Sequence, residues 1–163
     1  KKCSINILNT GKSSMTGGRL KKVSKFIKKN ENFMFTYGDG LSDVNLMELE
    51  KFHKKNKKIA TITAVRPPAR FGELTINKKI VTKFIEKPQV SEGWINGGFF
   101  IANEKIFRFI KNDKTILEKQ PLEKLSKSKQ LLAFKHNGFW RCMDTKRDKD
   151  FLEKLSKTRK AKW

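Results

Sequence analysis

Residues 33–40 read Phe33-Met34-Phe35-Thr36-Tyr37-Gly38-Asp39-Gly40. An aromatic and apolar run that ends in glycines is typical of a buried strand that opens into a loop. The glycines would let a ligand approach the backbone beside the Asp39 carboxylate. Taken alone, however, Gly-Asp-Gly more often marks a turn in which the aspartate binds nearby amides.

Strand patterns alternate with amphipathic helix patterns along the rest of the chain. The predicted strands cover 33–37, 59–65, 97–101 and 131–134, and a hairpin covers 74–85. The predicted helices cover 21–29, a segment capped by Asp43 or Asn45, 103–110, 116–125 and a last helix opened by Asp144-Thr145. This order predicts one α/β domain over residues 1–163, a mostly parallel sheet flanked by helices with a β-hairpin insertion.

A second acidic candidate, Asp144, follows Gly138-Phe139-Trp140 in a strand-to-helix position like that of Asp39. In open α/β sheets, ligands bind at the carboxyl ends of the strands, where these two aspartates are expected to meet. Mg²⁺ commonly takes one or two protein carboxylates together with substrate phosphates. The pair therefore predicts a magnesium site, although Asp144 alone is also typical of a helix N-cap.

Two further motifs combine polar groups suited to a sugar phosphate or a nucleotide. Glu86-Lys87-Pro88 offers an acceptor for sugar hydroxyls beside a cation for phosphate, or else an exposed ion pair worth about 0–1 kcal/mol. Thr16-Gly17-Gly18-Arg19 precedes a predicted helix, whose free amides would attract an anion. The same four residues are also consistent with a helix start and nothing more.

The net charge of +22 raises the alternative of a basic nucleic-acid-binding module. Only seven of the 38 basic residues are Arg, and the lysines are scattered through nearly every segment, which favours a solvated surface over a specific binding face. A zinc site is not indicated, because zinc-ligand spacing is found neither between the two cysteines, Cys3 and Cys142, nor between the two histidines, His53 and His136. No apolar run is long enough for a membrane span, and no secretory signal is evident, so we expect a cytoplasmic protein.

Six motifs occur in the order found in glucose-1-phosphate cytidylyltransferases, and the chain resembles that family nearly from end to end. The motifs are Met15-Thr16-Gly17-Gly18-Arg19-Leu20-Lys21, Phe35-Thr36-Tyr37-Gly38-Asp39-Gly40 with Ser42-Asp43-Val44-Asn45, Pro67-Pro68 followed by Arg70-Phe71-Gly72, Glu86-Lys87-Pro88, Trp94-Ile95-Asn96-Gly97-Gly98-Phe99-Phe100, and Phe139-Trp140 with Met143-Asp144-Thr145. Each motif alone is general to sugar nucleotidyltransferases, but the first and the fifth point to the cytidylyl branch.

The resemblance implies a Rossmann-like nucleotidyltransferase fold and a role for each site residue. Asp39 and Asp144 would hold the catalytic Mg²⁺, Glu86 would take sugar hydroxyls, and Lys87 would take the sugar phosphate. The Gly72 backbone and the Asn96 side chain would line the sugar pocket. The nucleotide would be bordered by Thr16, Gly17, Gly18 and Arg19.

The implied reaction joins CTP and α-D-glucose 1-phosphate to give CDP-glucose and pyrophosphate, for polysaccharide biosynthesis. By the same resemblance the intact protein is expected to form a homo-oligomer, with no membrane and no specific nucleic acid as partner. Two alternatives from other classes stay open: the basic nucleic-acid-binding module, and a non-catalytic remnant that keeps the sugar-phosphate pocket.

The sequence departs from the family pattern at its start and at Cys142. The Gly-Thr-Arg and Lys-Pro-Lys-Pro elements that grip the triphosphate are absent from the 163 residues, and the first strand of the sheet is expected to be missing with them. We therefore expect an N-terminally truncated fragment that is poorly stable and nearly inactive by itself. Cys142 stands where the family usually has a proline, which affects only the local loop.

Overall fold

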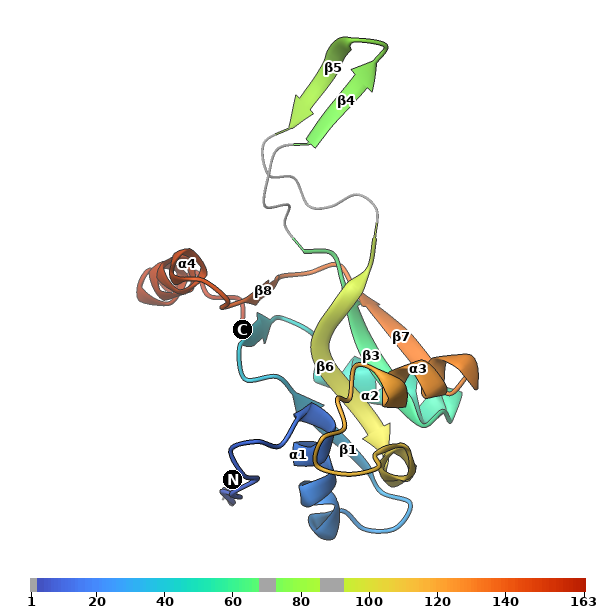
Figure 1. Ribbon diagram of the computed structural model, residues 1–163. Helices are drawn as coiled ribbons and strands as arrows, with labels where there is room; N and C mark the ends of the chain where they lie inside the picture. Colours follow the sequence, from blue (N-terminus) through green and yellow to red (C-terminus); the bar gives the residue numbers. More distant parts are fainter. Residues whose placement is uncertain (1–2, 68–72, 86–92) are drawn as a thin grey trace. The chain divides into compact units, whose positions relative to one another are not determined.

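A computed structural model describes residues 3–67, 73–85 and 93–163, and its secondary structure is mixed α/β (Figure 1). The helices are α1 (Thr16–Val23), α2 (Leu46–Asn56), α3 (Gln120–Lys127) and α4 (Lys146–Lys157), with short 3-10 helices η1 (Ser24–Phe26) and η2 (Glu104–Phe109). The strands are β1 (Asn32–Thr36), β2 (Gly40–Ser42), β3 (Ala60–Val65), β4 (Glu73–Asn77), β5 (Ile80–Ile85), β6 (Ile95–Asn103), β7 (Leu131–His136) and β8 (Trp140–Cys142).

The described strands form one four-stranded sheet and two short antiparallel pairs. The larger sheet has the strand order β1-β6-β3-β7, and the pairs are β2 with β8 and β4 with β5. Because β6 lies between two strands that precede it in the chain, the sheet is built from crossover connections, as in α/β folds. The expected α/β class is confirmed, and no described helix has the length and apolar content needed to span a bilayer.

The chain divides into two compact units. The first contains residues 1–35, 50–61 and 100–132, and the second contains residues 36–49, 62–99 and 133–163. The motifs that carry the family resemblance are divided between them, since Thr16-Gly17-Gly18-Arg19 belongs to the first unit and Asp39, Asn96 and Asp144 belong to the second.

Several predicted elements are confirmed because short-range chemistry fixes them. The β4–β5 hairpin pairs Leu74 with Phe84 and turns at residues 78 and 79, as its alternating pattern predicted. Asn45 caps α2, since its Oδ1 accepts hydrogen bonds from the amides of Met47 and Glu48 at 3.0 and 3.1 Å. These choices depend on neighbouring residues alone.

Other elements differ from the prediction in type or bounds. The predicted helix over 21–29 is wrong at both ends, because α1 begins at Thr16 and continues only as the 3-10 turn η1 after Val23. The predicted helix over 103–110 is the 3-10 helix η2, and the one over 116–125 begins at Gln120. The strand that opens the Gly-Asp-Gly loop is half-buried rather than buried, since Met34 and Thr36 are exposed.

The first unit has an apolar core with stacked aromatic rings. Phe35 stacks on Phe100 with ring centroids 4.6 Å apart, and Phe33 stacks on Phe107 at 5.4 Å. The almost fully buried apolar residues of this unit include Ala60, Ile101, Ala102, Ile106, Ile110, Leu117 and Leu125. Because side chains from three separate stretches of sequence fill this core, their packing stabilises the unit as a whole.

His53 is the one buried histidine in the described part of the chain, and its pKa is lowered because burial disfavours the charged ring. Its Nδ1 lies 2.8 Å from the Thr61 hydroxyl. Below its ordinary pKa of 6.5 the unfolded chain binds a proton that the folded ring resists, so the free energy of unfolding falls as the pH drops through 6.5.

We predict that His53→Gln, which keeps a hydrogen-bonding side chain but cannot titrate, makes unfolding less dependent on pH. Between pH 7.5 and 5.5 the free energy of unfolding should fall by about 1 kcal/mol more in the original protein than in the variant. Urea unfolding followed by circular dichroism at several pH values measures both. Equal pH dependence in the two proteins would contradict the assignment.

Candidate active site

The two predicted metal ligands, Asp39 and Asp144, lie at the same end of the antiparallel pair formed by β2 and β8, here called the β2–β8 ribbon. The strands pair antiparallel with Gly40 opposite Cys142 and Ser42 opposite Trp140. One residue beyond the paired region, the Met143 amide donates to the Asp39 carbonyl over 2.9 Å. Asp39 therefore lies across from Met143. Asp144 directly follows Met143 in the chain, and Asp39 and Asp144 are both exposed.

This pairing differs from the arrangement that the sequence predicted. The two aspartates were expected at neighbouring ends of strands in a parallel sheet, whereas they flank an antiparallel ribbon that is separate from the four-stranded sheet. Each strand of the ribbon has three residues, which is too few for an alternating pattern to be visible in the sequence.

Asp144 does not act as the cap of α4. The Thr145 hydroxyl accepts from the Asp148 amide at 3.2 Å, and Asp148 in return accepts from the Thr145 amide, which forms a capping box. The helix-cap interpretation of Asp144 is therefore wrong. Instead the Cys142 thiol donates to Asp144 Oδ2 over 3.2 Å. Burial and the Asp144 carboxylate raise the pKa of Cys142 to about 11, so the thiol keeps the proton that it donates.

The aspartate pair has the donor chemistry of a magnesium site but does not enclose an ion by itself. Among residues 3–67, 73–85 and 93–163, no three His, Cys, Asp or Glu side chains form a group that could hold a metal. Two exposed carboxylates at one ribbon end fit a hard cation that takes its remaining oxygen ligands from phosphates and water. They do not fit a zinc site, which needs a closed set of protein ligands.

Asn96, predicted to line the sugar pocket, anchors the backbone beside the Gly-Asp-Gly loop. Its Nδ2 donates to the Tyr37 hydroxyl at 3.1 Å, and its Oδ1 accepts from the Gly98 amide at 2.8 Å. The Tyr37 amide donates to the Gly98 carbonyl at 3.3 Å. Gly98 has a φ of +80°, and a Cβ there would lie 2.7 Å from the Tyr37 ring, so only glycine fits.

Trp140 supplies a contact that sequence reasoning missed. Its indole Nε1 donates to the Gly97 carbonyl over 2.7 Å, which ties the first residue of β8 to the glycine pair of β6. Gly97 is itself packed against Val65, since a Cβ would lie 2.7 Å from Val65 Cγ1. The Gly138-Phe139-Trp140 stretch and the Gly97-Gly98 pair were visible in the sequence, but the proximity of Trp140 to Gly97 was not.

The four residues Thr16, Gly17, Gly18 and Arg19 make internal contacts within the first unit. The Thr16 hydroxyl donates to Glu118 Oε2 at 2.6 Å and accepts from the Leu117 amide at 2.9 Å. The Gly18 amide donates to the Thr115 carbonyl at 3.2 Å. Their role at the nucleotide stays a prediction, but one of the helix-start amides expected to attract an anion is used by this carbonyl.

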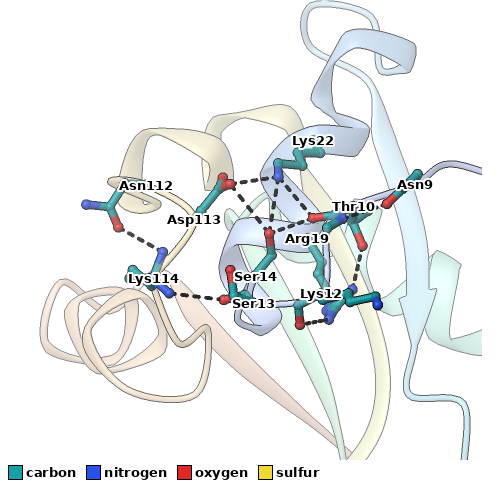
Figure 2. Close-up of polar contacts among 11 residues, drawn as sticks. Asn9, Thr10, Lys12, Ser13, Ser14, Arg19, Lys22, Asn112, Asp113 and Lys114 are labelled. Carbon is teal, nitrogen blue, oxygen red and sulfur yellow. Dashed lines mark hydrogen bonds and ion pairs between the residues drawn. The ribbon is translucent and has the colours of Figure 1, made fainter.

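A polar cluster around Lys22 holds the segment before α1 (Figure 2). Lys22 Nζ lies 2.7 Å from Asp113 Oδ2 and donates to the Thr10 carbonyl at 2.9 Å and to Ser14 Oγ at 3.1 Å. The hydrogen bond from Lys22 holds the pKa of Asp113 below its usual range. Arg19 Nη1 adds a hydrogen bond of 2.6 Å to the Thr10 hydroxyl. Residues 10–14 are therefore fixed to α1 by charge-assisted hydrogen bonds.

The second unit contains a basic and aromatic pocket of about 360 Å³ beside β8. Its lining includes Arg66, Arg141, Lys162, Phe139, Trp140 and Phe151. Arg141 is fixed by Asp148, whose Oδ1 accepts from Nε at 3.1 Å and from Nη2 at 2.9 Å. The lining combines positive charge with aromatic faces, a chemistry suited to anionic groups.

Three predicted site residues, Gly72, Glu86 and Lys87, lie outside the described residues. Their expected roles at the sugar and its phosphate therefore stay predictions. Of the predicted residues that are described, Asp39, Asn96 and Asp144 belong to one compact unit and Thr16 to Arg19 belong to the other.

We predict that Gly18→Ala destabilises the protein, because the added Cβ would overlap the backbone of Asp113. Overpacking against backbone should lower the free energy of unfolding by about 1–3 kcal/mol. Gly38→Ala is the matched control, since a Cβ at Gly38 meets nothing within 4 Å. Urea unfolding of both variants measures the difference, and a Gly18→Ala protein as stable as the control would contradict the close packing.

Comparison with known proteins shows similarity to a nucleotidyl transferase family model and to curated relatives. The family model described as nucleotidyl transferase matches residues 1–160. A glucose-1-phosphate cytidylyltransferase of Salmonella typhimurium is 48% identical over 98% of the chain, and a probable one of Bacillus subtilis is 38% identical over 86%. The chain spans 62% and 55% of the length of these two relatives.

The fold comparison agrees with the sequence comparison. A crystal structure of a putative glucose-1-phosphate thymidylyltransferase from Bacillus anthracis superposes with a TM-score of 0.65 at 18% identity, covering 90% of this chain and 62% of that one. At this identity the likeness concerns the fold alone, which is that of a nucleotidyltransferase. With the matched family model and the two cytidylyltransferase relatives, these findings show that the chain belongs to the nucleotidyl transferase family.

Proposed function

We propose that the protein to which this chain belongs joins CTP and α-D-glucose 1-phosphate to give CDP-glucose and pyrophosphate. The observation that carries the proposal is the β2–β8 ribbon, which brings the exposed residues Asp39 and Asp144 to one end. The similarity to glucose-1-phosphate cytidylyltransferases supports the choice of base and sugar.

In the proposed reaction, an oxygen of the sugar phosphate attacks the α-phosphorus of CTP. The bond from that phosphorus to the bridging oxygen of the β-phosphate breaks, and pyrophosphate leaves with the bonding electrons. No covalent enzyme intermediate is needed, so the protein contributes by positioning the two substrates and by neutralising charge.

Asp39 and Asp144 would hold a Mg²⁺ ion through their carboxylate oxygens. When bound, this ion would neutralise the negative charge on the substrate phosphates. Lys87 would bind the sugar phosphate, Glu86 would accept hydrogen bonds from sugar hydroxyls, and Gly72 and Asn96 would line the sugar pocket. The residues that would border the nucleotide are Thr16, Gly17, Gly18 and Arg19.

Asn96 would bind the sugar through the amide proton and the acceptor site that its contacts to Tyr37 and Gly98 do not use. The amide nitrogen has two protons and the amide oxygen accepts two hydrogen bonds, while the contacts to Tyr37 and Gly98 use one of each. The internal contacts would then orient the side chain before the sugar arrives, which lowers the entropic cost of binding.

Three further expectations remain part of the proposal. The protein would work in the cytoplasm, where CTP is available, and it would assemble into a homo-oligomer. Its CDP-glucose would serve polysaccharide biosynthesis. The sugar-binding roles of Gly72, Glu86 and Lys87 rest on the family resemblance.

The reaction is tested with the chain itself and with a chimaera in which the chain is joined to the portion of the Salmonella typhimurium relative that it does not match. Pyrophosphate release is measured with CTP and glucose 1-phosphate in the presence of Mg²⁺. We expect turnover that prefers CTP and glucose 1-phosphate by at least about 10-fold over other nucleotides and sugar phosphates. No turnover by either protein, or equal turnover with every substrate, would defeat the assignment.

We predict that Asp39→Asn and Asp144→Asn each lower kcat by about 100-fold or more while the protein stays folded. An amide keeps the shape of the carboxylate but removes the charge that a magnesium ion requires. Asp150→Asn, an exposed aspartate on α4, is the control and should retain full activity. Steady-state kinetics with circular dichroism separate the two effects, and an unchanged rate in either site variant would remove that residue from the metal site.

A further inference from the structure

His136, before β8, and Asp43, after β2, form a histidine–aspartate pair that none of the proposed catalytic steps uses. His136 Nε2 lies 2.9 Å from Asp43 Oδ1 and 3.2 Å from the Phe139 carbonyl. Both oxygens only accept hydrogen bonds, so Nε2 carries a proton and donates to them. The His136 side chain is 12% exposed and that of Asp43 is 29% exposed, so the imidazole is largely shielded from water while the carboxylate is partly open to it.

This pair lies at the opposite end of the β2–β8 ribbon from the catalytic aspartates. Asp43 directly follows β2, and His136 is the last residue of β7, four residues before β8. At this end the Asp43 amide donates to the Phe139 carbonyl at 3.1 Å, and the Ser42 hydroxyl donates to the same carbonyl at 2.8 Å. The far end is held by the Met143 amide and the Asp39 carbonyl.

Gly138 shows that the backbone is shaped around this contact. A Cβ on Gly138 would overlap Asp43 Oδ1, and it would lie 2.6 Å from His136 Cε1 and 2.9 Å from His136 Nε2. Any other residue would therefore push the histidine and the aspartate apart. The short stretch from His136 to Phe139 contributes an imidazole donor, a glycine that makes room and a carbonyl acceptor to one contact.

We infer that His136 and Asp43 form a positioning pair that sets the register of the ribbon and thereby the spacing of Asp39 and Asp144. This inference rests on the proposed function, because it concerns the residues assigned to the metal. A ribbon of three residue pairs is marginally stable by itself, so contacts at its ends decide its register. A slip of one residue moves a strand by about 3.3 Å, which exceeds the tolerance of a magnesium site with ligands at about 2.0–2.1 Å.

The positioning role is distinguished from simple stabilisation by three variants of His136 and its neighbour. His136→Ala removes the donor, His136→Gln restores a donor near the position of Nε2, and Asn137→Ala changes an exposed neighbour as the control. We expect His136→Ala to lower kcat about 10- to 100-fold and to raise the half-saturating Mg²⁺ concentration, with the KM for glucose 1-phosphate changed less than about twofold. The His136→Gln and Asn137→Ala proteins should stay within about threefold of the original protein.

A second measurement is independent of activity and follows the Met143 amide, which lies at the catalytic end of the ribbon. Hydrogen exchange of this amide should become about 10-fold faster in His136→Ala and stay unchanged in His136→Gln and Asn137→Ala. If His136→Ala leaves this exchange unchanged, the pair does not set the register and the inference fails. If neither the chain nor the chimaera shows turnover, the proposed reaction fails, while the exchange measurement on the chain still decides whether the pair positions the ribbon.

A double variant tests whether the two residues act as a unit. His136→Ala combined with Asp43→Ala should lower kcat no more than the larger of the two single effects, because either change breaks the same contact. Effects that multiply would mean that the two side chains act separately, which would also overturn the inference.

Discussion

The hydrogen bond from the Met143 amide to the Asp39 carbonyl extends the pairing of β2 with β8 toward Asp39 and Asp144, the two residues proposed to hold the metal. Without this pairing, Asp39 and Asp144 would belong to distant stretches of chain with no reason to act together. Because the ribbon is short, side-chain contacts are needed to hold its two strands in place. The Trp140 indole fixes β8 to Gly97, and the Ser42 hydroxyl fixes β2 to the Phe139 carbonyl.

Several glycines lie where two backbone segments, or a side-chain ring and a backbone segment, come into close contact. Gly18 allows α1 to touch the Asp113 backbone, and Gly98 adopts a positive φ under the Tyr37 ring. Gly138 makes room for the contact of His136 with Asp43. In each place a side chain would separate the partners, so these glycines act through close approach more than through flexibility.

Part of the positive charge of the chain is used in contacts within the folded structure. Several cations are held in specific internal contacts, as Lys22 is by Asp113 and Arg141 is by Asp148. The acidic residues Asp39 and Asp144 sit together at the end of the ribbon, where a polyanion would be repelled unless a metal ion intervened. Much of the excess of lysine side chains lies on the solvated surface.

Sequence alone determined the features that depend on neighbouring residues: the strand before Gly38-Asp39-Gly40, a helix cap at Asp43 or Asn45, the β4–β5 hairpin and the family to which the motifs belong. Each follows from local turn chemistry, alternation or motif identity. Only the tertiary structure decided that α1 begins at Thr16, where Gly17 and Gly18 pack on Thr115 and Asp113, and that Asp39 and Asp144 lie at the same end of an antiparallel ribbon. Pairing between strands far apart in the chain is a property of the folded contacts, and three-residue strands carry too little pattern to reveal it.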